Sequence, residues 1–130
     1  GGAREVILVG FSLGGAVSTQ IADHPLVQRV IGLAPWLPKE LPVDALAGRE
    51  FHVIHGALDR RIPGVPGVHP DASRAGFERI RAAGATGTYR LIPFGTHAIA
   101  LRAPWGAPIP VPRAAEWVRQ VGDLIAAPSR

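Results

Sequence analysis

The stretch that decides the fold is VILVGFSLGG, residues 6–15. It continues a β-branched apolar run over 4–9, the pattern of a strand buried on both faces in a parallel sheet. Gly10, Phe11 and Ser12 follow the run, and a segment rich in small residues from 13 to 23 has the character of a helix. The sequence therefore predicts a strand, a sharp turn and a helix, with a serine in the turn.

The five residues from Gly10 to Gly14 fit the pattern G-x-S-x-G, in which a strand-to-helix turn exposes a nucleophilic serine. We expect the turn to strain Ser12 and to lift its Oγ clear of the sheet. Both glycines are expected to be necessary, because a Cβ at either position would strike the neighbouring strand or helix. The N–H of Leu13, at the helix start, is expected to stabilise an oxyanion. The alternative is a glycine-rich turn that only allows close helix–strand packing.

The rest of the chain alternates strands with helices. We predict strands over 27–33, 51–55 and 88–92, helices over 71–83 and 113–127, and loops over 34–49, 60–70 and 94–112. One helical turn is expected at 44–47. This alternation predicts an α/β fold with a mainly parallel sheet and helices on both faces. In the last helix we expect an apolar stripe that places Trp117 in the core and contains Ala114, Trp117, Val118, Val121, Leu124 and Ile125.

A serine nucleophile needs a base and an orienting acid, and in parallel sheets such groups gather at the carboxyl ends of the strands. Asp59 follows the third predicted strand, and His97 follows the fourth. The chain order serine, aspartate, histidine is the order of the G-x-S-x-G hydrolases. We therefore predict a triad of Ser12, Asp59 and His97.

The other candidate aspartates and histidines for the triad have positions that a structural role explains. Asp71 and Asp23 lie at predicted helix ends, where capping or solvent exposure accounts for them. The remaining histidines are placed at the far end of the first helix, in or beside the third strand, and in a loop before a helix: His24, His52, His55 and His69.

Composition limits the function classes. Hydrophobic residues make up 47% of the chain and charged residues 18%, which is typical of a globular protein and excludes a disordered one. The net charge of +4 comes mainly from scattered arginines, which we expect on a solvated surface and which do not indicate nucleic-acid binding. There is no cysteine for disulfides, thiolate catalysis or cysteine–zinc sites. No apolar run is long enough to cross a membrane.

These motifs resemble the α/β-hydrolase superfamily, in particular its single-domain esterases and dienelactone-hydrolase-like members. VILVGFSLGG is similar to the family's fifth strand and nucleophile turn, HGALDRRIP (55–63) to its H-G-x-x-D-x-x-V-P stretch, and FGTHAI (94–99) to its histidine loop. The resemblance implies that residues 1–130 are the C-terminal part of one domain, supplying strands five to eight of eight. The short 34–49 connection leaves no room for a lid.

The resemblance also shapes the functional prediction. Dienelactone hydrolases usually carry a cysteine nucleophile, so Ser12 favours ordinary hydrolysis of a small-molecule carboxylic ester, without a metal or other cofactor. Phe11, Trp36 and Trp105 are candidates for the substrate pocket, and core packing is the alternative for both tryptophans. A thioesterase or peptidase with the same triad, and a non-catalytic binding protein of this fold, remain open.

Other expectations concern the chain's context. No signal or transit sequence is visible at Gly1, and we expect a cytoplasmic protein. The absence of methionine favours an excerpt from a longer protein. The family's second oxyanion-hole donor lies in the half that precedes the fifth strand. We therefore expect residues 1–130 alone to be nearly inactive and to self-associate.

Overall fold

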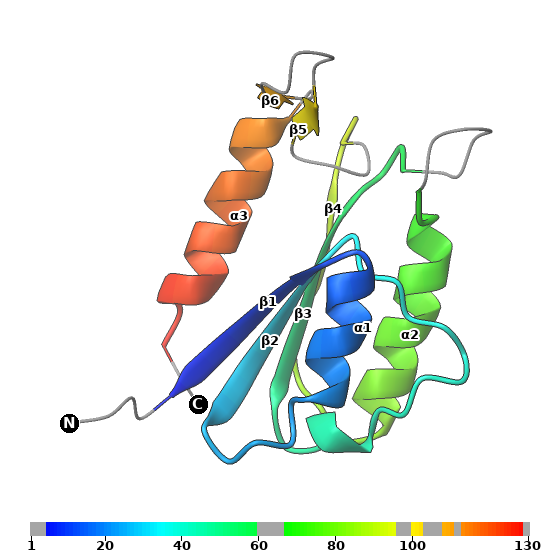
Figure 1. The fold of residues 1–130 in the computed structure, drawn as a ribbon, viewed down its shortest axis with the longest axis vertical. Helices are drawn as coiled ribbons and strands as arrows, with labels where there is room; N and C mark the ends of the chain where they lie inside the picture. The colour runs from blue at the N-terminus through cyan, green and yellow to red at the C-terminus, as the bar shows by residue number, and fades with distance from the viewer. Residues whose placement is uncertain (1–4, 60–66, 96–99, 103–107, 111–112, 129–130) are drawn as a thin grey trace.

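The structure, a computed structural model, describes residues 5–59, 67–95, 100–102, 108–110 and 113–128. Strands and helices alternate along the chain, and Figure 1 shows their arrangement. The elements are β1 (Val6–Phe11), α1 (Leu13–Gln20), β2 (Val27–Leu33), a 3-10 turn η1 (Asp44–Leu46), β3 (Glu50–Gly56), α2 (Pro70–Ala82), β4 (Tyr89–Ile92), β5 (Ala100–Arg102), β6 (Pro108–Pro110) and α3 (Ala114–Ala126).

The four longer strands form one parallel sheet in the order β1-β2-β3-β4. Their register brings the carboxyl ends together, since Phe11 pairs with Leu33, Leu33 with Ile54, and Gly56 with Ile92. The predicted parallel sheet is therefore confirmed. Residues that follow different strands in the sequence meet at this one edge.

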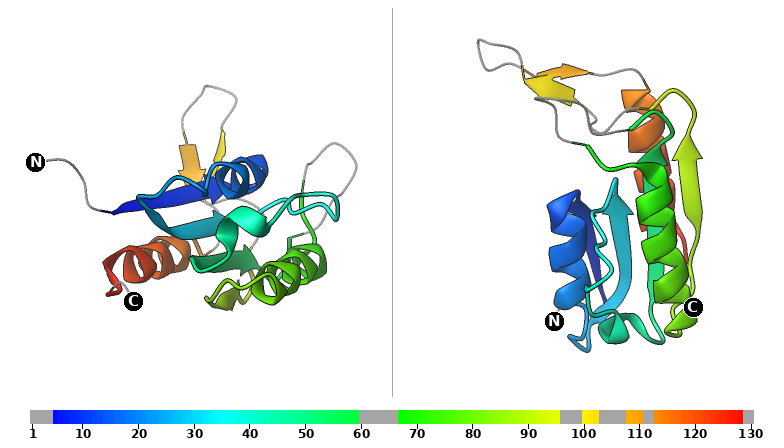
Figure 2. Two further views of the ribbon diagram at one scale, coloured as in Figure 1. Left: turned by 90° about the horizontal axis from the view of Figure 1, so that it is seen from below. Right: turned by 90° about the vertical axis from the view of Figure 1, so that its right-hand side faces the viewer.

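Helices cover both faces of the sheet, as predicted (Figures 1 and 2). On one face, Val30 and Phe51 pack in a core with Ala16 of α1 and Phe77 of α2. On the other face, the neighbouring strand residues pack against α3: Ile31, Leu33, Ile54 and Ile92 contact Trp117 and Leu124. Consecutive strand residues point to opposite faces, so a strand buried on both sides has a continuous apolar sequence.

Arg29, in β2, is an exception to the predicted solvated arginines, because only 1% of it is exposed. Its guanidinium donates to the last carbonyls of α3, at Leu124 (2.7 Å) and Ala127 (2.9 Å), and to Glu50 Oε2 (3.0 Å). Those carbonyls have no partner within a helix, and the cation also favours the negative end of the helix dipole. Arg29 thus ties the end of α3 to the sheet.

The carboxylate of Glu50 forms hydrogen bonds with both Arg29 and His52. Burial would raise the pKa of Glu50, but hydrogen bonds from Arg29 and His52 outweigh that effect and hold the pKa below its usual range. His52 also faces Thr88, whose backbone N–H donates to Nδ1 at 3.1 Å. His52 is therefore part of the packing between β3 and the start of β4.

The structure corrects several predicted details of the helices. α1 ends at Gln20, before the predicted limit of Asp23, because Ile21 leaves the helical conformation and a turn leads to β2. In α3, Trp117 and Leu124 are buried as predicted, but Val118 and Ile125 are 62% and 48% exposed. The apolar stripe is therefore narrower than predicted, because α3 contacts the sheet along the line of Trp117 and Leu124 and no other described element covers Val118 and Ile125.

The predicted loop over 94–112 contains a short antiparallel hairpin of β5 and β6. Prolines at both ends of β6 argued against a strand, since proline donates no ladder hydrogen bond. Each of these prolines pairs at an end of a three-residue ladder, where the loss is smallest. None of the helices in the described part of the chain is long and apolar enough to cross a bilayer.

Candidate active site

Ser12 occupies the turn between β1 and α1 in a rare backbone conformation, with φ 52° and ψ −114°. A non-glycine residue there is strained by about 1–3 kcal/mol, and such strain persists only where surrounding contacts enforce it. Three backbone hydrogen bonds do so. The Ser12 N–H donates to the Leu33 carbonyl, and the Ser12 carbonyl accepts from Gly15 and Trp36, all at 2.9–3.0 Å.

The position of Ser12 before a helix suggests a simpler role as an N-cap residue. An N-cap serine normally lies in the β region and accepts a hydrogen bond from the first turn through its side chain. Ser12 does neither, since its side chain makes no capping hydrogen bond to α1. Its Oγ is therefore not engaged by the helix that it precedes.

The glycines around Ser12 differ from the prediction. A Cβ on Gly10 would lie 2.3 Å from the Gly14 carbonyl oxygen, so Gly10 is sterically required, as expected. A Cβ on Gly14 would meet none of the described residues within 4 Å, so the predicted clash of Gly14 with the neighbouring strand or helix is wrong. The second restricted position is Gly15, where a Cβ would lie 2.6 Å from Cβ of Pro35. Helical geometry turns Gly15 toward the segment after β2, whereas Gly14 points away.

Leu13 is the first residue of α1, and its N–H is one of the donors that have no acceptor within a helix. No acidic side chain lies in the first turn of α1. The positive end of the helix dipole beside Ser12 is therefore not neutralised by α1 itself. This arrangement suits a negative charge that develops next to Ser12 Oγ.

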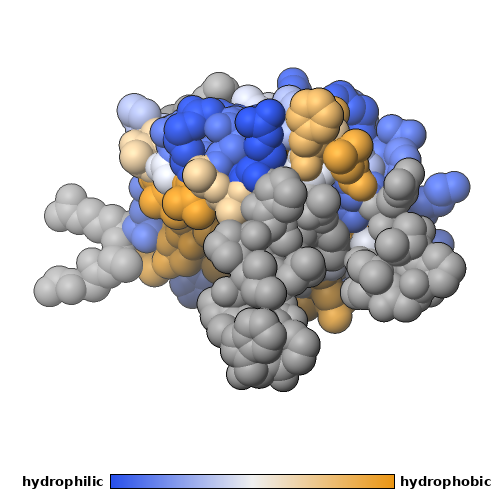
Figure 3. Space-filling view, turned by 90° about the horizontal axis from the view of Figure 1, so that it is seen from above, coloured by the Kyte–Doolittle hydropathy of each residue, from blue (hydrophilic) through white to orange (hydrophobic). Residues whose placement is uncertain are grey.

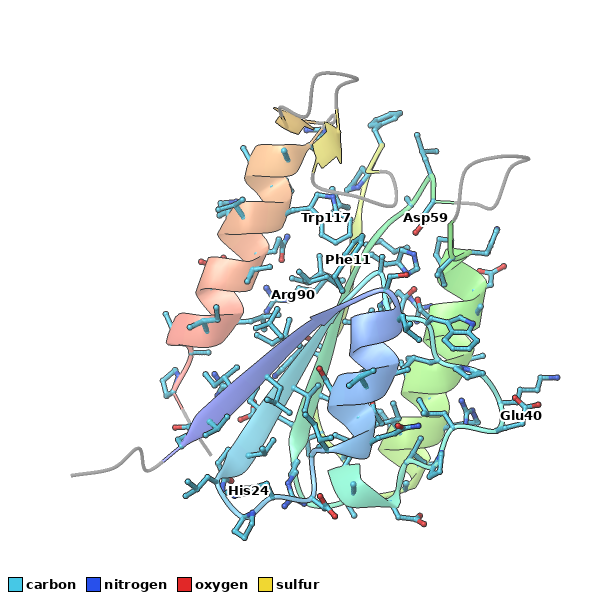
Figure 4. The ribbon with its side chains drawn as sticks, in the orientation of Figure 1. Phe11, His24, Glu40, Asp59, Arg90 and Trp117 are labelled. Atoms are coloured by element: carbon cyan, nitrogen blue, oxygen red, sulfur yellow. The ribbon has the colours of Figure 1, made fainter. Side chains whose placement is uncertain are left out.

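Asp59 lies just beyond the end of β3, at the same edge of the sheet as Phe11, the residue before Ser12 (Figure 4). It is 2% exposed. Its Oδ1 accepts a hydrogen bond from Val68 N–H at 3.0 Å, and its Oδ2 lies 2.7 Å from His55 Nε2. A carboxylate at this depth needs such donors to remain charged.

His97 and Trp105 lie outside the described residues. The chain that leads to His97 is described as far as Gly95, and it runs beside the loop that holds Asp59. The Leu58 N–H donates to the Gly95 carbonyl at 2.9 Å, and the Ala57 N–H donates to the Ile92 carbonyl at 3.0 Å. The loops after β3 and β4 are thus joined directly at the edge where Ser12 lies.

Apolar side chains reach the surface around this edge, which Figure 3 views from above. Phe11 and Leu13 are 43% and 59% exposed. Trp36, exposed by 48%, lies beside α1 and lines a mainly apolar groove of about 290 Å³. The other lining residues are Leu13, Ala16, Val17, Pro38, Leu41 and Pro42, with the polar Gln20 and Glu40. Of the two alternatives for Trp36, the structure favours a surface groove over the core.

The other acidic and histidine candidates have surroundings that differ from those of Asp59. His24 is at the opposite end of the sheet from Asp59 (Figure 4). The Asp71 side chain is 92% exposed, in the first turn of α2, and the N-cap of that helix is His69. Within the described ranges, no three histidine or acidic side chains are grouped to hold a metal ion. His55 is different, because it contacts Asp59, and sequence spacing gave no sign of that contact.

Neither a family model nor a curated protein matches this chain. Solved structures do match it. A putative dienelactone hydrolase from Klebsiella pneumoniae superposes with a TM-score of 0.66 at 21% identity, covering 98% of this chain. A Bacillus cereus carboxylesterase (TM-score 0.58, 18% identity, 92% of this chain) and Arabidopsis thaliana SOBER1 (TM-score 0.58, 22% identity, 77% of this chain) also match. The chain has the α/β-hydrolase fold.

The chain spans about half the length of the solved structures it matches: 54% of the Klebsiella protein, 51% of the Bacillus protein and 48% of SOBER1. Within this fold, Ser12 lies in the turn between β1 and α1, and Asp59 follows β3 at the same sheet edge.

Proposed function

We propose that this protein is a serine hydrolase that cleaves carboxylic esters, with Ser12 as nucleophile, His97 as base and Asp59 as the acid that orients His97. The observation that carries the proposal is the backbone of Ser12, held at φ 52° and ψ −114° with its side chain not used as a helix cap. A strained residue whose hydroxyl does not cap the following helix is expected where function requires that geometry.

In the proposed reaction, His97 removes the proton of Ser12 as Oγ attacks the ester carbonyl. The carbonyl oxygen becomes an oxyanion, which the Leu13 N–H stabilises at the positive end of α1. His97 then passes its proton to the leaving alcohol, and the acyl group stays on Ser12. A water molecule, deprotonated by His97, releases the acid and restores Ser12.

Two observations support the assignment of Asp59 and His97. Asp59 is buried and receives hydrogen bonds on both carboxylate oxygens, which favours its charged form. A carboxylate oxygen can accept more than one hydrogen bond, so these contacts are compatible with one from an imidazole. The Leu58–Gly95 hydrogen bond keeps the chain before His97 next to Asp59.

The substrate proposal rests on the surroundings of Ser12. The apolar groove begins at Leu13 and runs along α1 toward Gln20, over a rise of about 10 Å. An apolar acyl or alcohol group is the chemistry that fits this lining. The matched structures named as a dienelactone hydrolase and a carboxylesterase agree with hydrolysis of an ester. A thioesterase or a peptidase would use the same groups.

The proposal is tested on the full-length protein with an alkyl fluorophosphonate probe and with three substrates that share one acyl group: an aryl ester, a thioester and an anilide. We expect the probe to label Ser12 and the ester to be hydrolysed fastest. Ser12→Ala should abolish labelling and turnover, and His97→Ala should lower kcat by about 10³-fold or more. Ser18→Ala, which replaces a buried serine of α1, the helix after Ser12, is the matched control and should keep the activity.

The alternatives give different results in the same experiment. Faster hydrolysis of the thioester or the anilide would make the protein a thioesterase or a peptidase. Labelling that survives in Ser12→Ala, or a wild-type protein that is neither labelled nor active, would refute the assignment. The second outcome would favour a binding protein with this fold.

A further inference from the structure

The buried side chain of His55 makes contacts that the proposed reaction does not use. His55 lies in β3 and is 0% exposed. Its Nε2 lies 2.7 Å from Asp59 Oδ2 and 2.8 Å from the Val68 carbonyl oxygen. Both of these atoms can only accept a hydrogen bond while Asp59 is charged. Nε2 therefore carries a proton, which Asp59 Oδ2 and the Val68 carbonyl oxygen share.

The other ring nitrogen is held at the opposite end. Nδ1 lies 2.7 Å from Oγ of Ser73, a buried residue of α2. The hydroxyl either donates to a neutral ring or accepts from a charged one, and in both cases the Nε2 proton stays on the Asp59 side. Two hydrogen bonds at opposite ends of the imidazole fix its orientation.

Ser73 is itself held by Tyr89 of β4. The Tyr89 hydroxyl lies 2.6 Å from Ser73 Oγ and donates to the Pro70 carbonyl at 2.7 Å. Burial raises the pKa of the Tyr89 phenol, although the hydrogen bond with Ser73 and the nearby Arg74 cation oppose the shift. The phenol therefore remains a donor at neutral pH. The chain of contacts from Tyr89 through Ser73 and His55 ends at Asp59.

Among the described contacts, the carboxylate of Asp59 accepts from His55 on Oδ2 and from Val68 N–H on Oδ1. The His55 side chain is anchored to α2 through Ser73, and Ser73 is in turn held by Tyr89 of β4. We propose that His55 is a positioning residue, which fixes the Asp59 carboxylate in the orientation that accepts a hydrogen bond from His97. This inference rests on the proposed function, because Asp59 acts only as the acid of that triad.

The test compares His55→Leu, which has a similar volume and no donor, with His55→Gln, whose Nε2 can still donate to Asp59. Loss of alignment by about 1 Å costs up to about 10²-fold, so we expect His55→Leu to lower kcat by about 10–100-fold with little change in KM. His55→Gln should recover most of that loss. In His55→Leu, the acidic limb of the pH–rate profile should move to lower pH, because a misaligned carboxylate stabilises protonated His97 less.

A double-mutant cycle separates positioning from simple packing. If His55 acts through Asp59, then His55→Leu should have no further effect on kcat in an Asp59→Asn background. Independent, additive losses would overturn the proposal, as would a normal kcat in His55→Leu. If His55→Leu fails to fold, Ser73→Ala replaces it, since that change removes the anchor of Nδ1 and leaves the ring in place. Ser73→Ala is then expected to lower kcat without a change in KM.

Nuclear magnetic resonance of the histidine side chains gives a readout that does not depend on activity. We expect a slowly exchanging Nε2 proton on His55 that shifts in Asp59→Asn. An unprotonated Nε2 would overturn the proposal even in an active enzyme. The two proposals can also fail separately. If the His55 Nε2 proton is present but wild type and Ser12→Ala have the same activity, the proposed function is wrong, whereas the hydrogen bond between His55 and Asp59 is confirmed.

Discussion

Alanine substitutions at Gly10 and Gly14 distinguish two expectations for the turn that holds Ser12. The sequence pattern G-x-S-x-G treats both of its glycines as required, whereas the structure shows a steric requirement at Gly10 and, among the described residues, none at Gly14. In Gly10→Ala, the new Cβ would lie 2.3 Å from the Gly14 carbonyl oxygen and 2.5 Å from the Gly14 carbonyl carbon. Ordinary van der Waals contact begins near 3.4 Å, so β1 and α1 must separate by 3.4 − 2.3 = 1.1 Å. In Gly14→Ala, the Cβ meets none of the described residues within 4 Å.

These geometries give opposite expectations for stability. Overpacking typically costs about 1–3 kcal/mol, and a backbone obstacle cannot rotate away, so we expect about 3 kcal/mol for Gly10→Ala. Gly14→Ala adds helix propensity and reduces the freedom of the unfolded chain, which should leave stability unchanged or raise it by up to about 1 kcal/mol.

The assay is urea denaturation of both variants and the wild type, with tryptophan fluorescence as the signal that monitors unfolding. Equal midpoint and slope for Gly10→Ala and Gly14→Ala would refute the steric argument. Greater loss in Gly14→Ala would show that the pattern, with both glycines equally required, describes the turn better than the geometry does. Gly15→Ala, with a Cβ 2.6 Å from Cβ of Pro35, should resemble Gly10→Ala.

Three further predictions concern the acid, the anchor of α3 and the sheet edge. Asp59→Asn should lower ester-hydrolysis kcat by about 10³–10⁴-fold, while Asp71→Asn, whose parent side chain is 92% exposed, should match wild type; exchanged results would make Asp71 the acid. Arg29→Leu should lower the free energy of unfolding by about 3–5 kcal/mol in urea denaturation, because Glu50 loses its buried partner. Adding Glu50→Gln should recover part of that loss, and an unchanged stability of the single variant would contradict the prediction. Residues 1–130 expressed alone should self-associate in size-exclusion chromatography, because β1 pairs only with β2 in the described sheet and Val9 is 45% exposed. Val9→Lys should increase the monomer fraction. A monomeric unsubstituted protein would show that the exposed edge of β1 does not drive association.

The sequence by itself determined the order of the four longer strands and the three α-helices, but not the β5–β6 hairpin, and it determined the place of Ser12. Both depend on short-range patterns: a β-branched apolar run for β1, and a glycine-flanked serine between that run and a helix. The positions of Ser12 and Asp59 at one edge followed as well, because parallel strands bring their carboxyl ends together.

The tertiary structure alone decided which side chains meet across those elements. Arg29 contacts the end of α3, 95 residues away, and His55 contacts Ser73 from another layer. The crowding of Gly10 and the freedom of Gly14 likewise depend on how α1 lies against β1. The physical reason is that strand and helix periodicities are set by neighbours in the chain, whereas steric contact and hydrogen bonding between layers depend on the packing of whole elements.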